Sequence, residues 1–167
     1  MSDEIQARVT SDLIVGGRMV VPSGAKVLGK VVDLHLAGKD DPDTRLLVVF
    51  EKITTQEGRS FHFAYPAFVK ALAPDQRVAM AHTNFNDLPI KAELGKTMDR
   101  VTNWPVLPGD SNSVMYGVIS PIATGVFGFD RLKLRDTPMG VYIIAPKGNI
   151  KLEYGAQMVL SVPTPAK

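Results

Sequence analysis

Several segments of the chain alternate between apolar and polar residues with a period of two. This alternation runs through residues 131–135, 61–65, 32–36 and 157–162. Such a period is typical of a strand that buries one face and exposes the other. The run Leu46–Phe50 is apolar at every position, which predicts a strand at the centre of a sheet.

Residues that favour turns separate these predicted strands. Gly16 and Gly17 stand between Leu13–Val15 and Met19–Val21, which is the spacing of a hairpin with a two-residue turn. The other predicted turn or bend positions are Pro22, Gly24, Gly29 and Gly58. Short strands with such turns between them are typical of a β-barrel or a β-sandwich.

The region from about residue 74 to residue 113 interrupts the pattern, because prolines become frequent and the alternation fades. The sequence allows short helical segments at residues 75–81 and 88–101, the second with Pro89 in its first turn. We therefore predict one domain over residues 1–167. Its expected fold is all-β, a barrel-like antiparallel domain with a partly helical or irregular insertion at about 74–113.

Composition and charge exclude classes of protein rather than select one. A net charge of +2 without a dense block of Lys or Arg gives no indication of a nucleic-acid partner. The absence of cysteine excludes disulfides, thiolate nucleophiles and cysteine-bound metals. The first residues show no leader pattern. We therefore expect a cytoplasmic protein, unless a leader precedes Met1 in the natural protein.

The segment from Gly24 to Val31 matches the phosphate-binding loop G-x-x-x-x-G-K at every fixed position except the last. Val31 stands where a Ser or Thr hydroxyl would hold Mg²⁺. That loop must also open a helix, whereas the residues after Lys30 alternate like a strand. We interpret Gly24 as a turn and Gly29 as a bulge or bend, where a β-carbon is unfavourable. Lys30 is expected to bind no nucleotide.

Two groups of residues resemble metal sites only in part. A calcium loop that began at Asp40 would need a ligand at its third position and a glycine at its sixth. Pro42 and Arg45 occupy these two positions. The histidines His35, His62 and His82 have no second histidine or carboxylate at the spacing of a zinc site. We expect a solvated acidic loop, surface histidines and no metal ion.

No pattern of a catalytic site is present. There is no G-x-S-x-G turn, and a chain without cysteine has no Cys–His pair. Trp104, which precedes Pro105, is a candidate for stacking on a sugar or for anchoring a partner, and packing on the domain is its alternative. No catalytic or cofactor-binding residue is predicted.

The longest uncharged stretch, Ser111 to Phe129, has two interpretations. It is either a pair of buried strands bent at Pro121, or a glycine-rich apolar segment that inserts into a neighbouring subunit or a membrane interface. Its proline and glycines argue against a transmembrane helix. Its candidate interface residues are Val114, Tyr116, Val118, Phe127 and Phe129.

Three segments resemble the conjugation TrbI-like family. Residues 18–32, with Val20, Pro22, Gly24, Ala25 and Gly29, are similar to its V-x-P-x-G-(S/A)-x-x-x-G-x-V signature. Residues 45–60 are similar to a strand and turn of that family, and residues 150–162 to its closing strand. The family comprises β-barrel subunits of the outer-membrane core of type IV secretion systems. The same segments resemble a group of uncharacterised bacterial envelope proteins.

The resemblance implies a periplasmic or outer-envelope location, if a leader is present. With the sequence patterns, it leads us to expect a non-enzymatic structural or assembly subunit without a cofactor. Such a subunit would self-associate or dock on other envelope proteins, with membrane contact but no transmembrane helix. The alternative is a binding module for cell-wall glycan or a small ligand, with Trp104 and Tyr116 as stacking residues. An enzyme ranks third.

Overall fold

The computed structural model describes residues 3–76, 114–115 and 118–163, and the regular elements within these ranges are all strands. The strands are β1 (Glu4–Arg8), β2 (Leu13–Val15), β3 (Arg18–Val21), β4 (Lys26–His35), β5 (Thr44–Thr54), β6 (Ser60–Ala73), β7 (Val114–Met115), β8 (Val118–Ile119), β9 (Gly125–Val126), β10 (Lys133–Thr137), β11 (Gly140–Ala145) and β12 (Gln157–Ser161). The predicted all-β, mainly antiparallel fold is thereby confirmed. Most of the predicted insertion, residues 77–113, lies outside the described residues.

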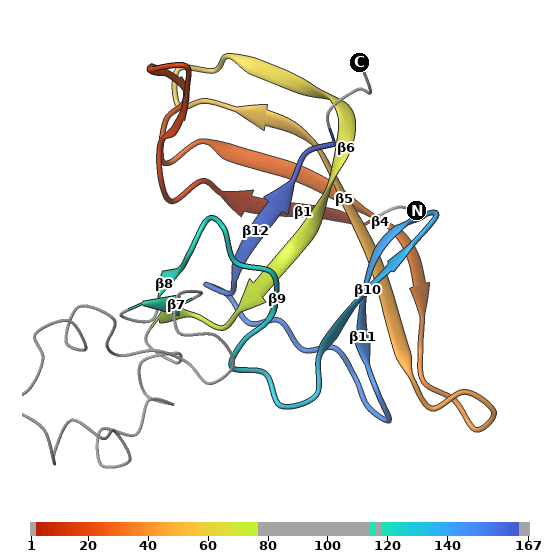
Figure 1. Cartoon of the computed structure of the whole chain (residues 1–167). Helices are drawn as coiled ribbons and strands as arrows, with labels where there is room; N and C mark the ends of the chain where they lie inside the picture. Colours follow the sequence, from red (N-terminus) through yellow and green to blue (C-terminus); the bar gives the residue numbers. More distant parts are fainter. Residues whose placement is uncertain (1–2, 77–113, 116–117, 164–167) are drawn as a thin grey trace, which may run out of the picture.

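Eight strands form one sheet, in which β1, β4, β5, β11 and β10 lie side by side in that order. The central strand β5 pairs with β4 along its length and changes partner on its other side. There Thr44–Leu47 pairs with β11, whereas the stretch from Phe50 to Thr54 pairs with β6. The sheet therefore divides at residues 48–49 into two branches, which leave β5 in different directions (Figure 1).

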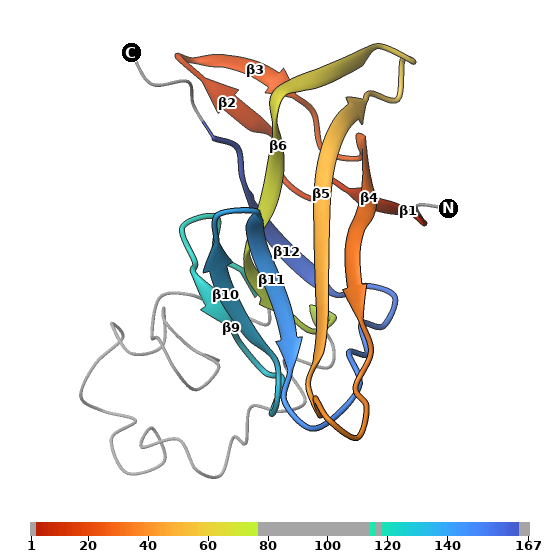
Figure 2. The same ribbon diagram turned by 90° about the vertical axis from the view of Figure 1, so that its right-hand side faces the viewer.

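The two halves of β6 have different neighbours, and the strand curves between them (Figure 2). Its first half pairs with β5, and its second half pairs with β12 and, at Ala71 and Leu72, with β9. Pro66, which has no N–H to donate, lies where the partner changes. Among the strands that the structure describes, β1 and β12 do not pair, so the barrel-like sheet stays open.

The main core lies where the two branches meet and draws side chains from β3, β4, β5, β6 and β11. Its larger buried members are Val21, Val27, Val48, Phe50, Ile53, Val69, Leu72 and Ile143. Burial of a side chain of this size stabilises the fold by about 1.5–3 kcal/mol. A second, smaller cluster joins Phe127 to alanines of β6 and to Ala123.

Three predictions from the sequence pattern are confirmed. Gly16 and Gly17, with φ of 58° and 77°, form the two-residue turn between β2 and β3. The run Leu46–Phe50 lies in the central strand β5, and its residues from Leu47 onward are buried. Along residues 131–135, the leucines pack against the core and the charged side chains are exposed.

Two predictions of a half-buried strand face are wrong, because no described residue covers the apolar side chains of that face. Leu34 and Leu36 are exposed, since β1 pairs only with residues 26–30 of β4 and leaves the rest of that strand at a sheet edge. Phe63 packs against the core as expected, but Phe61 and Tyr65 are exposed. Hydrophobic alternation thus marks a strand without showing that its apolar face has a neighbour.

Gly24 and Gly29 both occupy positions that a side chain would disturb. A β-carbon on Gly29 would lie 2.6 Å from the carbonyl oxygen of Val49 and 2.7 Å from Cδ1 of Phe50. Gly29 and Phe50 are directly opposite at a register shift, so the aromatic ring covers the glycine. Gly24 has a φ of 84°, which favours glycine, within the turn that leads into β4.

Candidate functional site

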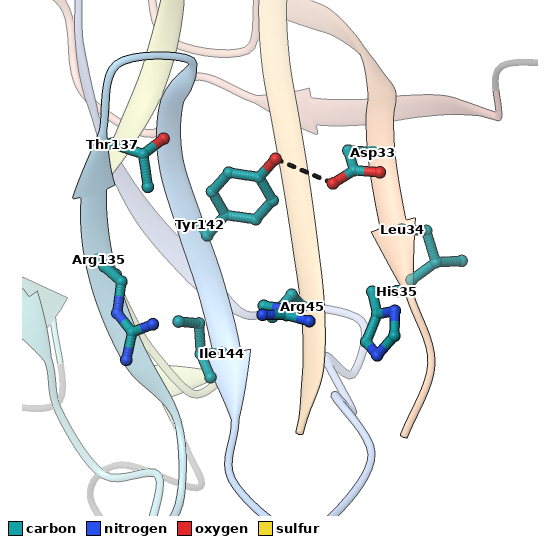
Figure 3. A pocket seen from close by; sticks show the side chains of 8 residues that line it. All are labelled: Asp33, Leu34, His35, Arg45, Arg135, Thr137, Tyr142 and Ile144. Carbon is teal, nitrogen blue, oxygen red and sulfur yellow. Dashed lines mark hydrogen bonds between the residues drawn. The ribbon is translucent and has the colours of Figure 1, made fainter. Parts of the chain in front are cut away.

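A polar groove of about 390 Å³ crosses the face of β4, β5, β11 and β10 that is turned away from the main core. Its lining residues, drawn in Figure 3, are Asp33, Leu34, His35, Arg45, Arg135, Thr137, Tyr142 and Ile144. Strand register explains how they meet, because residues directly opposite each other share a face. One such row is His35, Arg45 and Ile144, and the next is Asp33, Leu47, Tyr142 and Arg135.

Tyr142 spans the central strand to reach Asp33 (Figure 3). Its hydroxyl donates a hydrogen bond of 2.9 Å to Oδ2 of Asp33, across the buried Leu47 of β5. The hydrogen bond to Asp33 raises the pKa of Tyr142, and partial desolvation and the negative charge of Asp33 act in the same direction. The two neighbours of the central strand, β4 and β11, are thereby linked by a polar contact.

A second polar cluster lies at the His35 end of the groove. Asp41 forms an ion pair with Arg45, and its Oδ2 lies 3.3 Å from Nε2 of His35. That nitrogen is shielded from solvent and has no partner with hydrogen-bond geometry among the described residues. Protonation of His35 would make the 3.3 Å contact an ion pair.

The remaining cation of the groove is Arg135, which forms no hydrogen bond or ion pair with another residue in ranges 3–76, 114–115 and 118–163. A guanidinium offers a planar set of donors that fits carboxylates and vicinal hydroxyls. With Tyr142 and Thr137 beside it over the buried Ile144, this arrangement can hold a small polar or anionic group. The groove thus offers a candidate binding site for such a group.

Replacing Asp33 with alanine is expected to lower the pKa of Tyr142, since the acceptor and its negative charge are both removed. The phenol must keep its proton to donate, so the contact is present below about pH 10 and is lost as pH rises through the raised pKa of Tyr142. Phenolate absorbance during a pH titration measures this, with Tyr142→Phe identifying the signal. Identical curves for the parent and Asp33→Ala would show that the hydrogen bond does not form in solution.

The structure corrects the expected interface at Ser111–Phe129. Phe127 is only 5% exposed and lies in the smaller core cluster, and Phe129 packs against the main core. The reason is a long-range contact, because the N–H of Phe127 donates to the carbonyl of Leu72 in β6. Val118 is exposed, as an interface residue should be.

Other candidates of the sequence fall outside what the structure describes. These are Trp104, Tyr116 and His82, and the side chain of Val114 in β7.

Lys30 and the acidic loop have structural partners. Lys30 lies in β4, where its Nζ is 2.6 Å from Oε1 of Glu51, and the chain from Gly24 continues into this strand. Asp43 accepts a hydrogen bond from the N–H of Lys147, and Asp41 binds Arg45. No group of three metal-binding side chains occurs in the part of the chain that the structure describes.

The exposed apolar surface of the β2–β3 hairpin was not expected from the sequence pattern. Leu13, Ile14, Met19 and Val20 are 49%, 62%, 60% and 48% exposed. Both strands are apolar at successive positions, with no polar face for solvent. That lack of alternation, in a hairpin so near the surface, is the signal that could have revealed it.

Comparison with protein-family models, curated proteins and solved structures finds no match for this chain. Over the described residues, none of the elements is a helix with the length and apolar character that crossing a bilayer requires.

Proposed function

We propose that this protein is a non-enzymatic assembly subunit of the bacterial cell envelope that acts by self-association. The observation that carries this proposal is the exposed apolar hairpin β2–β3, which forms a separate two-stranded sheet beside the main one. A two-stranded hairpin is marginally stable in water without further packing. Val21, at its base, is buried in the main core, but Leu13, Ile14, Met19 and Val20 face solvent.

A second copy offers these side chains a natural cover. Ile14 and Met19 are directly opposite each other, so they present one apolar surface on the same face of the hairpin. Contiguous exposed apolar surface of this kind typically marks a protein interface. The envelope location rests on the similarity of residues 18–32, 45–60 and 150–162 to barrel subunits of secretion systems, with which the open barrel-like fold agrees.

The double substitution Ile14→Asp and Met19→Asp is expected to weaken self-association by about tenfold or more, because charged residues would have to be desolvated at the interface. Sedimentation velocity over a range of protein concentrations measures the effect, and circular dichroism checks that the fold is kept. Leu36→Asp is the matched control, since Leu36 is equally exposed and follows the far end of β4. Its association should equal that of the parent.

Val118→Asp tests whether the Ser111–Phe129 segment contributes to self-association, because Val118 is one of the exposed residues of that segment. A parent chain that stays monomeric at high concentration would contradict the proposal that the protein is an assembly subunit.

The polar groove favours a second candidate, a binding module for glycan or a small ligand. Its specific support is the set of planar polar side chains, Asp33, Arg135 and Tyr142, held on three different strands over buried Ile144. This candidate gains if the parent chain is monomeric, since an assembly subunit must associate and a binding module need not.

A further inference from the structure

We infer that two copies of this chain pair through β1, antiparallel and centred on Gln6, so that the sheets of both copies join. This inference rests on the proposed self-association and adds to the β2–β3 hairpin a second contact, along a sheet edge, with a defined register. β1 is one end of the strand order β1-β4-β5-β11-β10, and no described strand pairs with its outer edge. Figure 2 shows β1 on the side of β4 that faces away from β5.

The hydrogen-bond pattern shows which residues face the outer edge. The carbonyl of Asp3 accepts from Val31, and the N–H of Val9 donates to Ala25, so residues 3 and 9 are directed toward β4 and its flanking residues. This direction alternates along an antiparallel strand. The N–H and C=O groups of Glu4, Gln6 and Arg8 therefore point outward, with no described strand to receive them.

This edge lacks the devices that usually prevent pairing. Natural edge strands carry lysines, prolines or bulges. β1 contains no lysine or proline, and its register with β4 is continuous from Glu4 to Arg8. The opposite end of the order, β10, carries one of these devices, Lys133. Of these two edges, β1 is the one open to another strand.

The side chains of β1 are complementary to a second copy of themselves. When two antiparallel copies are centred on Gln6, Glu4 of each lies opposite Arg8 of the other. The three facing pairs are Glu4 with Arg8, Gln6 with Gln6, and Arg8 with Glu4. The main-chain groups of all these residues point outward, so each pair can exchange two hydrogen bonds. If the pair is instead centred on Ile5 or Ala7, Glu4 of one copy no longer lies opposite Arg8 of the other. A self-complementary strand is what a two-fold interface requires.

Charges within one copy support the same arrangement. Arg8 lies opposite Lys26 of β4, a like-charge pair, and has no acidic partner among the described residues. From the described residues, Glu4 accepts only a 3.2 Å hydrogen bond, donated by Nε2 of Gln6. The Glu4 of a second copy would place a carboxylate beside Arg8 and reduce its repulsion with Lys26. On the other face, Ile5 would meet Ala7 of the second copy and extend the apolar core.

The test is a set of charge reversals examined by sedimentation velocity at low salt. Arg8→Glu or Glu4→Arg alone places like charges opposite each other twice in the pair, and each is expected to weaken dimerisation by about tenfold. Mixing the two single variants restores opposite charges at every position, because one chain is then basic and the other acidic. We expect the mixture to form a heterodimer with affinity close to that of the parent.

Arg59→Glu is the matched control, since Arg59 is exposed in the turn between β5 and β6, and it should dimerise like the parent. Equal association of the parent and both single variants would overturn the β1 pairing. If that association still requires Ile14 and Met19, the proposed function survives alone. Loss in the single variants that mixing does not restore also contradicts the inferred register, whereas a monomeric parent overturns both proposals.

Discussion

Alanine at position 29 is expected to lower the free energy of unfolding by about 1–3 kcal/mol, the usual cost of placing an extra atom in packed structure. The new β-carbon would lie 2.6 Å from the carbonyl oxygen of Val49. A main-chain atom in the central strand cannot move without disturbing the pairing of β4 with β5. Urea unfolding followed by circular dichroism measures the change.

Gly38→Ala provides the matched control, because nothing lies within 4 Å of a β-carbon at that position. Its stability should equal or slightly exceed that of the parent. Combining Gly29→Ala with Phe50→Leu identifies the obstacle. If the new methyl group at position 29 meets the ring of Phe50, the stability losses of the two substitutions are less than additive. If it meets the carbonyl oxygen of Val49, the two losses add. A Gly29→Ala chain that unfolds like Gly38→Ala would refute the close approach.

Phe50→Ala is expected to have the largest effect of any single change, about 3–5 kcal/mol. Phe50 is 0% exposed, stands at the point where β5 exchanges β11 for β6, and contributes to the main core. The cavity left by its ring cannot collapse easily, because two branches of the sheet hold its walls apart.

Phe61→Ala is the comparison, since Phe61 is 48% exposed on β6. Its cost should stay below about 1 kcal/mol. If both phenylalanines cost the same in urea unfolding, the core is not where the structure places it.

Local patterns were sufficient to predict most strands and the β2–β3 turn, because period and turn chemistry depend on neighbours along the chain. They failed where an outcome depended on distant segments. Phe127 is buried because residues 71–72 of β6 pair in parallel with β9, a contact that no local pattern contains. Leu34 is exposed for the converse reason, since β1 ends its pairing before reaching it.

The groove was beyond prediction for the same reason. Asp33 and Tyr142 are separated by 109 residues and meet only because β5 lies between their strands. His35 was assigned correctly to a strand but not to a cluster, since Asp41 comes from the turn between β4 and β5, and Arg45 lies opposite His35 in β5. Chemistry assembled across a sheet can be recognised only once the strand order is known.

The parallel pairing of β6 with β9 also sets a requirement on the connection between the two strands. β6 ends at Ala73 and β9 begins at Gly125, so the connection has to return along the length of the pair before β9 can run in the same direction. The fold fixes the two ends of this connection but not its length. In a flexible loop, doubling the length adds only about 0.6 kcal/mol of entropic cost. A reporter domain inserted between Ala73 and Gly125 would leave the groove and the outer edge of β1 in place, because neither draws a residue from this connection.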